Sequence, residues 1–127
     1  MNKEVLDLWL TALRSGEYKQ CYGRLRIGDT YCVLGVLCDV HQKNTGEGEW
    51  YFSPSAYFVP KYNYRSQDGC FESTSFLIKP VLEWAELNFE DYAGPCIPED
   101  SDNSLSIHSD SPKSFTELAD LLEERFK

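Results

Sequence analysis

The chain of 127 residues is poor in several features that mark common protein classes: it has two histidines, one methionine and no long hydrophobic run. Residues 1–7 contain no hydrophobic stretch like that of a secretory signal, and no segment approaches the roughly 20 apolar residues of a membrane-spanning helix. The five cysteines are an odd number and contain no CxxC pair. These absences predict a cytoplasmic protein with free thiols and without membrane contact, bound metal or cofactor.

Basic residues are scarce in the second half of the chain. Residues 67–127 contain four Lys or Arg against fourteen Asp or Glu, and the whole chain has a net charge of −9. Because a nucleic-acid backbone is bound by clustered Lys and Arg, this balance argues against wide contact with DNA or RNA. It leaves open a small anionic ligand held by a few arginines of the neutral first half.

Hydrophobic residues recur at helical spacing in four segments, with short extended segments between them. Helices are predicted over residues 4–15, 32–42, 80–87 and 114–126, and strands over 49–52, 57–59, 70–73, 96–97 and 105–107. Asn2 and Ser114 are the predicted N-caps of the first and last helices. This pattern predicts a single α+β domain over residues 1–127, with a small antiparallel sheet and three to four helices. We expect the first and last helices to pack against the short helix that contains Trp84.

The apolar segment over residues 31–40 fits both a buried strand and a buried helix, because periodicity does not separate the two in so apolar a run. The spacing of its valines favours a helix over 32–42. Gly35, in the middle of this segment, lowers helix propensity but would let another element of the fold approach closely.

Four sequence blocks occur in an order that resembles a family of small proteins of tailed phages and prophages. The most specific block reads Tyr-Cys-Val-Leu-Gly-Val-Leu-Cys-Asp over residues 31–39; the others lie at residues 8–20, 80–87 and 114–123. The chain departs from this family at Cys21, where relatives tend to have Gly, and near residues 105–110, where they have a Leu-Asn-Asp stretch. The resemblance carries no established activity. It implies a phage-coded accessory or counter-defence protein in the cytoplasm of an infected host cell.

Candidate catalytic and metal-binding residues are few. Cys38 and His41 are three residues apart and would share one face of a helix, but nothing near them indicates an activated thiolate or a second pair of metal ligands. The other histidine, His108, is far away in the sequence. Most carboxylates of the second half fall at predicted solvent-facing positions. We therefore predict no catalytic residue and no metal site, and interpret the thiols as buried core residues.

Arginine, lysine and tyrosine are interleaved in the first half of the chain and again near residue 64. An arginine fork binds phosphate through two parallel hydrogen bonds, and an aromatic face stacks on a base. Nine residues are therefore candidates for ligand binding: Arg14, Tyr18, Lys19, Arg24, Arg26, Tyr31, Asp39, Tyr64 and Arg65. In this interpretation Asp39 bonds a ribose hydroxyl or holds Arg24 or Arg26 in an ion pair. The simpler alternative is a sheet that carries Tyr and Arg on its outer face and binds no ligand.

These features favour a non-enzymatic protein that binds and sequesters a small anionic ligand, with a nucleotide-derived immune signal as the favoured class. One alternative is an inhibitor that uses its acidic face against a host defence enzyme or nucleic-acid enzyme. Another is an enzyme that cleaves nucleotides. A homodimer with its pocket between the subunits is also open, since an isologous interface would present the same aromatic residues from both sides.

Overall fold

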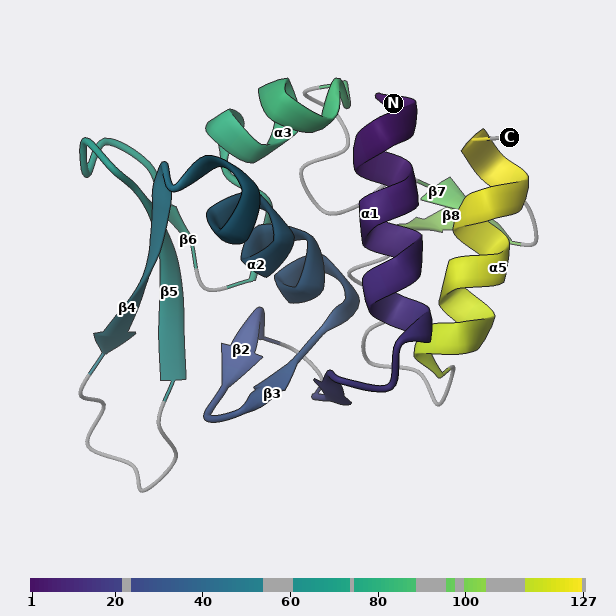
Figure 1. The fold of residues 1–127 in the computed structure, drawn as a ribbon, viewed down its shortest axis with the longest axis horizontal. Coiled ribbons are helices and arrows are strands. Elements are labelled where there is room, and N and C mark those ends of the chain that lie inside the picture. Colours follow the sequence, from purple (N-terminus) through teal and green to yellow (C-terminus); the bar gives the residue numbers. More distant parts are fainter. Residues whose placement is uncertain are drawn as a thin grey trace.

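Figure 1 shows a computed structural model of the protein, which describes residues 1–21, 24–53, 61–73, 75–88, 96–97, 100–104 and 114–126. Its described helices are α1 (Lys3–Arg14), α2 (Val33–Thr45), α3 (Lys79–Ala85) and α5 (Phe115–Phe126). Each of them overlaps a segment in which the hydrophobic spacing predicts a helix, so the four predicted helices are confirmed.

The other regular elements of the described structure are strands. They are β1 (Lys19–Gln20), β2 (Arg26–Ile27), β3 (Thr30–Tyr31), β4 (Gly48–Ser53), β5 (Lys61–Ser66), β6 (Glu72–Ser73), β7 (Cys96–Ile97) and β8 (Asp100–Ser104). The main sheet has the order β1-β3-β2-β5-β4, with β6 beside β5, while β7 pairs with β8. All these pairs are antiparallel except β1 with β3. The fold is α+β as predicted, but the sheet is mixed rather than purely antiparallel.

Strand β5 was not predicted from the sequence, although it is one of the two longest strands. In register with β4, it places Trp50 opposite Tyr64 and Phe52 opposite Tyr62. Successive residues of a strand point to opposite faces, so Tyr62 and Tyr64 lie on one face of the hairpin and Arg65 on the other. The strands predicted over 57–59 and 105–107 lie outside the described residues.

Helix α2 is the centre of the fold, between the β4–β5 hairpin on one side and α1 with α5 on the other (Figure 1). Every residue from Val33 to His41 is buried. A helix that is apolar on all sides is typical of an element surrounded by others, which is why its sequence also fits a buried strand. Gly35 lies directly against the chain at Leu25: a Cβ built on Gly35 would come within 1.8 Å of the Leu25 carbonyl oxygen.

Helix α1 packs against both α2 and α5. Its apolar stripe is buried, and the indole Nε1 of Trp9 donates a 3.0 Å hydrogen bond to the carbonyl oxygen of Val33 at the start of α2. The predicted N-caps are confirmed, because the side chain of Asn2 accepts from the Val5 amide and that of Ser114 accepts from the Glu117 amide. Helix α3 contacts both α1 and α2.

A buried polar pair lies where α2, the hairpin and α3 meet. The Nδ1 atom of His41 is 2.6 Å from the hydroxyl of Tyr64, and the rings of Tyr64 and Trp84 both approach the imidazole edge-to-face. The other imidazole nitrogen, Nε2, is buried and has no hydrogen-bond partner among the described residues. Burial lowers the pKa of His41 below its usual 6.5, and the charge of Glu47 offsets this in part.

We expect this pair to destabilise the fold in mild acid. Below pH 6.5 the unfolded chain binds a proton at His41 that the folded chain resists, so the free energy of unfolding decreases as pH falls through that range and on through the lowered folded pKa. Urea unfolding of the wild type and of His41→Phe over this range measures the effect. The variant should show a smaller decrease, and equal decreases in both proteins would contradict the prediction.

Candidate functional site

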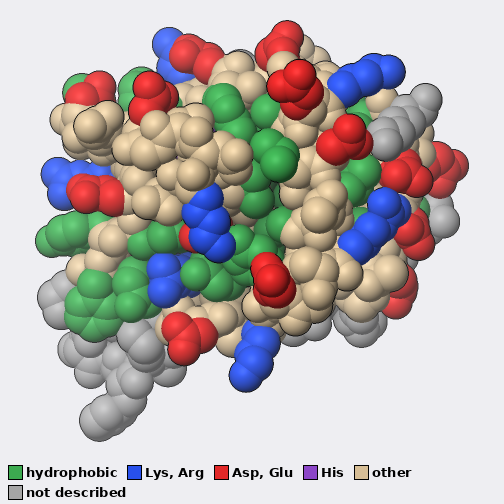
Figure 2. All heavy atoms as spheres, viewed as in Figure 1, with side chains coloured by type: hydrophobic (Ala, Val, Ile, Leu, Met, Phe, Trp, Pro, Cys, Tyr) green, Lys and Arg blue, Asp and Glu red, His purple; other side chains and the backbone are tan. Residues whose placement is uncertain are grey.

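A surface of aromatic and basic side chains covers the ends of β2 and β3 and the nearby part of the hairpin. We call it the aromatic–cation surface; it consists of Tyr18, Arg26, Tyr31, Lys43, Trp50 and Tyr62. Figure 2 shows hydrophobic side chains over this part of the molecule, with Lys and Arg side chains among them. These residues come from the segment before β1, from β2, β3, α2, β4 and β5, one residue each.

The aromatic rings pack edge-to-face in a continuous row that runs from this surface into the core. Ring centroids are 5.1 Å apart between Tyr18 and Tyr31, 5.8 Å between Tyr31 and Trp50, and 4.9 Å between Trp50 and Tyr64. Such T-shaped pairs add stability beyond the area that they bury. The row fixes the half-buried outer rings on a rigid base, because its inner end is the fully buried Tyr64.

Arg26 is held against three of these rings. Its guanidinium carbon lies 4.1 Å from the ring centroid of Tyr62, 5.1 Å from that of Tyr31 and 5.5 Å from that of Trp50. Its Nε donates a 2.8 Å hydrogen bond to the carbonyl oxygen of Gly28 in the β2–β3 turn. The terminal N–H groups of this guanidinium have no acceptor among the described residues. They remain as a positioned, partly desolvated pair of donors.

Asp39 organises the other half of the surface from beneath. Its carboxylate is buried and accepts three bonds: from the Tyr18 hydroxyl at 2.5 Å, from the Lys43 ammonium at 3.0 Å and from the indole Nε1 of Trp50 at 3.1 Å. The Lys43 ammonium is also 3.1 Å from the Tyr18 hydroxyl. Asp39 therefore orients the surface residues and is not paired with Arg24 or Arg26. Lys43 neutralises Asp39, whereas Arg26 forms no ion pair with a carboxylate among the described residues.

This network alters the proton affinity of its members. Burial, and then the hydrogen bond to Asp39, raises the pKa of Tyr18 to about 12. The hydrogen bonds to Tyr18 and Asp39 raise the pKa of Lys43 above its usual range. At neutral pH the phenol is therefore protonated and the ammonium charged. The phenol donates its one proton to Asp39, so the donor that the network leaves for a ligand is the third N–H of Lys43.

The structure brings together four of the nine predicted ligand residues: Tyr18, Arg26, Tyr31 and Asp39. The remaining five lie around or away from them. Arg14 bonds to Asp120 and Glu123 and so links α1 to α5, while Tyr64 is in the core. Arg65 lies on the opposite face of the hairpin, with its guanidinium carbon 5.3 Å from the Tyr51 ring centroid. Lys19 is exposed beside Tyr18 on β1, and Arg24 is half-buried beside Leu25.

Three residues of the surface were not among the predicted ligand residues: Lys43, Trp50 and Tyr62. The spacing of Asp39 and Lys43, four apart on a helix, could have indicated their ion pair. The alternation of Lys61–Ser66 could have placed Tyr62 on the same face as Tyr64. Trp50 carried no such signal, because its place depends on the register between β4 and β5.

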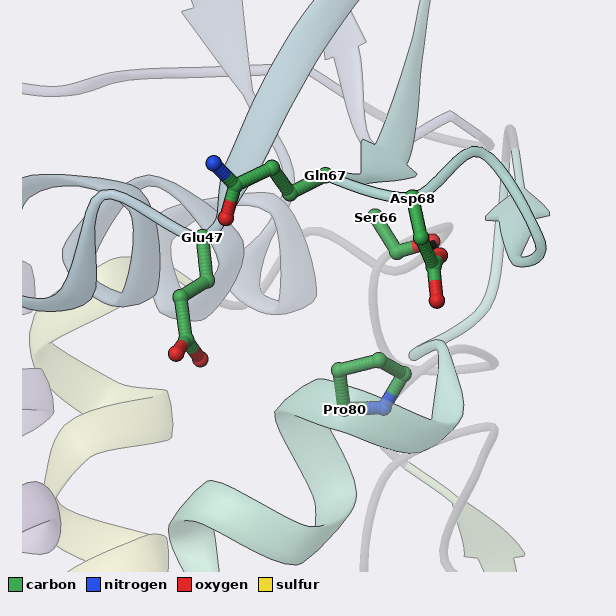
Figure 3. A pocket seen from close by; sticks show the side chains of 5 residues that line it. All are labelled: Glu47, Ser66, Gln67, Asp68 and Pro80. Carbon is green, nitrogen blue, oxygen red and sulfur yellow. Dashed lines mark hydrogen bonds between the residues drawn. The ribbon is translucent and has the colours of Figure 1, made fainter.

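The molecule has two hollows near this part of the structure. One adjoins the aromatic–cation surface, and the other lies away from it. A groove of about 560 Å³ runs between α1 and α2 and ends at Tyr18 and Lys43. A second hollow of about 320 Å³ is lined by Glu47, Ser66, Gln67, Asp68 and Pro80 (Figure 3). In the second, the Ser66 hydroxyl donates to the Asp68 carboxylate, which also accepts from the Cys70 amide, and these bonds lower the pKa of Asp68. Its two carboxylates make it unsuited to an anion.

The reactive groups singled out in the sequence are spread apart. Cys21, Cys32 and Cys38 are buried free thiols and Cys70 is an exposed one. Burial raises the pKa of Cys38 well above its usual value, which disfavours the thiolate. Within the described ranges no three His, Cys, Asp or Glu side chains gather as metal ligands do. His108 lies outside those ranges.

The fold and its surface define a small α+β domain in which a central helix carries a buried carboxylate beneath clustered aromatic and basic side chains. The chain belongs to the family described as a domain of unknown function, DUF8296, which matches residues 1–126. No curated protein and no solved structure matches the chain. None of the described helices is both long enough and apolar enough to cross a membrane.

Proposed function

We propose that this protein binds a small anionic ligand that carries a flat ring, and that the aromatic–cation surface is the binding site. The observation that carries the proposal is the position and hydrogen bonding of the Arg26 guanidinium. Its guanidinium lies over three aromatic rings, is fixed through Nε to Gly28, and has its terminal donors unused by the described residues. Donors held in this way bind a phosphate or carboxylate without a cost for ordering the side chain.

Nucleotide-derived signals are the ligand class that fits these groups. A base could stack on the half-buried face of Tyr31 or Tyr62 while its phosphate accepts from Arg26. Lys43, which lies over the Tyr18 ring, would offer its remaining ammonium N–H to the same ligand, although its charge is balanced by Asp39. Two or three such contacts are the usual polar content of a small-molecule site.

The proposal is binding and sequestration rather than turnover. The groups at the surface that could transfer a proton are already bonded to one another, since Asp39 accepts from Tyr18, Lys43 and Trp50. Cys38 is buried with a raised thiol pKa, and His41 is buried against Tyr64. The resemblance of residues 31–39 to phage proteins supports a role as an accessory factor that withdraws an immune signal in an infected cell.

Thermal unfolding against linear nucleotides, cyclic nucleotides and ADP-ribose derivatives tests the proposal. A ligand at about 100 times its dissociation constant should add roughly 2.7 kcal/mol to the free energy of unfolding, which raises the melting temperature by several degrees. Arg26→Ala should weaken binding of the same ligand by roughly 10- to 100-fold, the value of a lost charge-assisted bond. Arg125→Ala, which removes the same charge from exposed α5, is the matched control.

Two outcomes would reject this function. One is a complete panel without any thermal shift. The other is a ligand whose affinity decreases equally in Arg26→Ala and Arg125→Ala, which would mean that only net charge matters. Mass spectrometry of the recovered ligand separates the mechanisms: an intact ligand supports sequestration, and a cleaved one supports an enzyme.

A further inference from the structure

A second feature of the molecule is the groove between α1 and α2. It has a volume of about 560 Å³. One face of α1 and the residue after it line one side of the groove, with residues spaced three and four apart: Glu4, Asp7, Leu8, Thr11, Ala12 and Ser15. Helix α2 contributes Val40, Lys43 and Asn44 from the other side. Along α1 the groove spans about 16 Å, the length of roughly three helical turns.

The floor of this groove is apolar and open to solvent. Leu8 is 40% exposed, whereas the neighbouring apolar residues Trp9 and Leu10 are buried. Ala12 and Val40 continue the apolar floor toward α2. A single exposed leucine is ordinary, but one that lies in a groove between two helices is an anchoring position of the kind that receives an amphipathic helix.

The rim of the groove is acidic. Glu4 on α1 and Glu17 beyond its end carry negative charges, and Asp7, which also interacts with another residue of the chain, adds a third. The single base of the lining, Lys43, is paired with Asp39 at 3.0 Å and so adds little positive charge. A partner that fits must therefore bring apolar side chains to the floor and positive charges to the rim.

We propose that the α1–α2 groove binds an amphipathic, lysine- or arginine-rich helix of a partner protein. Its length, apolar floor and acidic rim correspond to about three turns of such a helix, with apolar anchors at spacings of three and four residues. The described helices of this chain do not supply this occupant. Helix α5, for example, carries Glu117, Asp120, Glu123 and Glu124 against Arg125, so a second copy would bring like charge to the rim.

The probe is a synthetic helical peptide of about 12 residues, with leucine at spacings of three and four and lysine elsewhere. A second peptide with glutamate in place of every lysine tests for charge. Binding is measured by fluorescence anisotropy to the wild type, to Leu8→Ser, and to the groove variant Glu4→Gln/Asp7→Asn/Glu17→Gln. The control variant Glu49→Gln/Glu83→Gln/Glu124→Gln removes the same number of charges from other parts of the surface. The amide spectrum of each variant by NMR establishes that it is folded.

We expect the lysine peptide to bind and the glutamate peptide not to bind. The groove variant should weaken binding by roughly tenfold and the control variant by no more than roughly twofold, because only the rim charges face the peptide. Leu8→Ser should also weaken binding of the lysine peptide. A purely electrostatic attraction would not be affected by this substitution, because it changes no charge. Amide shifts on peptide addition should fall on α1 and α2 around Thr11 and Asn44.

The proposal is overturned if the lysine peptide does not bind, or if the groove and control variants weaken it equally, since the latter is non-specific attraction to an acidic protein. The groove shares Tyr18 and Lys43 with the aromatic–cation surface, but the proposal rests on Leu8 and the acidic rim and not on Arg26. Arg26→Ala should leave peptide binding unchanged, and Leu8→Ser should leave nucleotide binding unchanged, so failure of one proposal is distinguishable from failure of the other.

Discussion

Replacing Gly35 with alanine is expected to lower the free energy of unfolding by about 3 kcal/mol, although alanine is the better helix former. The added Cβ would come within 1.8 Å of the Leu25 carbonyl oxygen and 2.7 Å of the carbonyl carbon. These are backbone atoms, so no side-chain rotation relieves the clash. The helix and the β2 segment would have to separate, with a decrease of roughly 12 °C in melting temperature for a chain of this length.

The same substitution should also disturb the aromatic–cation surface, because Leu25 precedes Arg26 in the chain. Leu25 is fully buried, and its carbonyl oxygen accepts from the Cys32 amide at 3.1 Å. A shift of Leu25 therefore moves the guanidinium relative to Tyr31. Calorimetry of Gly35→Ala beside Gln42→Ala, a half-buried position on the same helix, measures the stability effect. A loss no greater than in Gln42→Ala, usually within about 0.5 kcal/mol, would show that the contact is not close in solution.

The block over residues 31–39 illustrates what could be predicted and why. Its helix, its buried cysteines and the close approach at Gly35 follow from local spacing and from the size of single residues. The Cys32 side chain accepts from the Gly35 amide at 3.3 Å and so caps the start of α2, which a list of favoured N-caps does not include. Asp39 was singled out, but its three donors come from a loop, from α2 and from β4, and that arrangement is set by tertiary packing.

In the candidate site, too, some features follow from the local sequence and others depend on tertiary packing. Interleaved Tyr and Arg indicated that a surface of this composition exists, and Tyr18, Arg26 and Tyr31 do lie together. Which other residues join them depends on strand register and sheet order, since β2 pairs with β5 across a long stretch of sequence. Because the residue pattern does not predict β5, it does not place Tyr62 against Arg26. Arg14 was separated from the surface for a similar reason: its ion pairs are formed with α5, more than a hundred residues away.

Asp39→Asn is expected to have the second large effect, a loss of about 3 kcal/mol in the free energy of unfolding. The carboxylate accepts from three donors, whereas the amide that replaces it has one oxygen and an NH₂ group that is itself a donor. At least one of Tyr18, Trp50 and Lys43 then faces a donor, and the first two are partly buried. Lys43→Gln is the comparison, because Asp39 then keeps the Tyr18 and Trp50 donors and loses only its exposed partner, so it should cost less than Asp39→Asn.

The phenol of Tyr18 reports on the same substitution independently of unfolding. Its pKa of about 12 is raised by burial first and by Asp39 second, so loss of the negative charge should lower it toward 10. A pKa raised in the folded state contributes stability that is complete below pH 10 and is lost as pH rises through 12. Wild-type stability should therefore decrease over this interval, and Asp39→Asn should show a smaller decrease. An unchanged phenol pKa in Asp39→Asn, followed by tyrosinate absorbance, would mean that Asp39 does not organise the surface. Arg26 and the rings around it would then have to be held by their own packing alone.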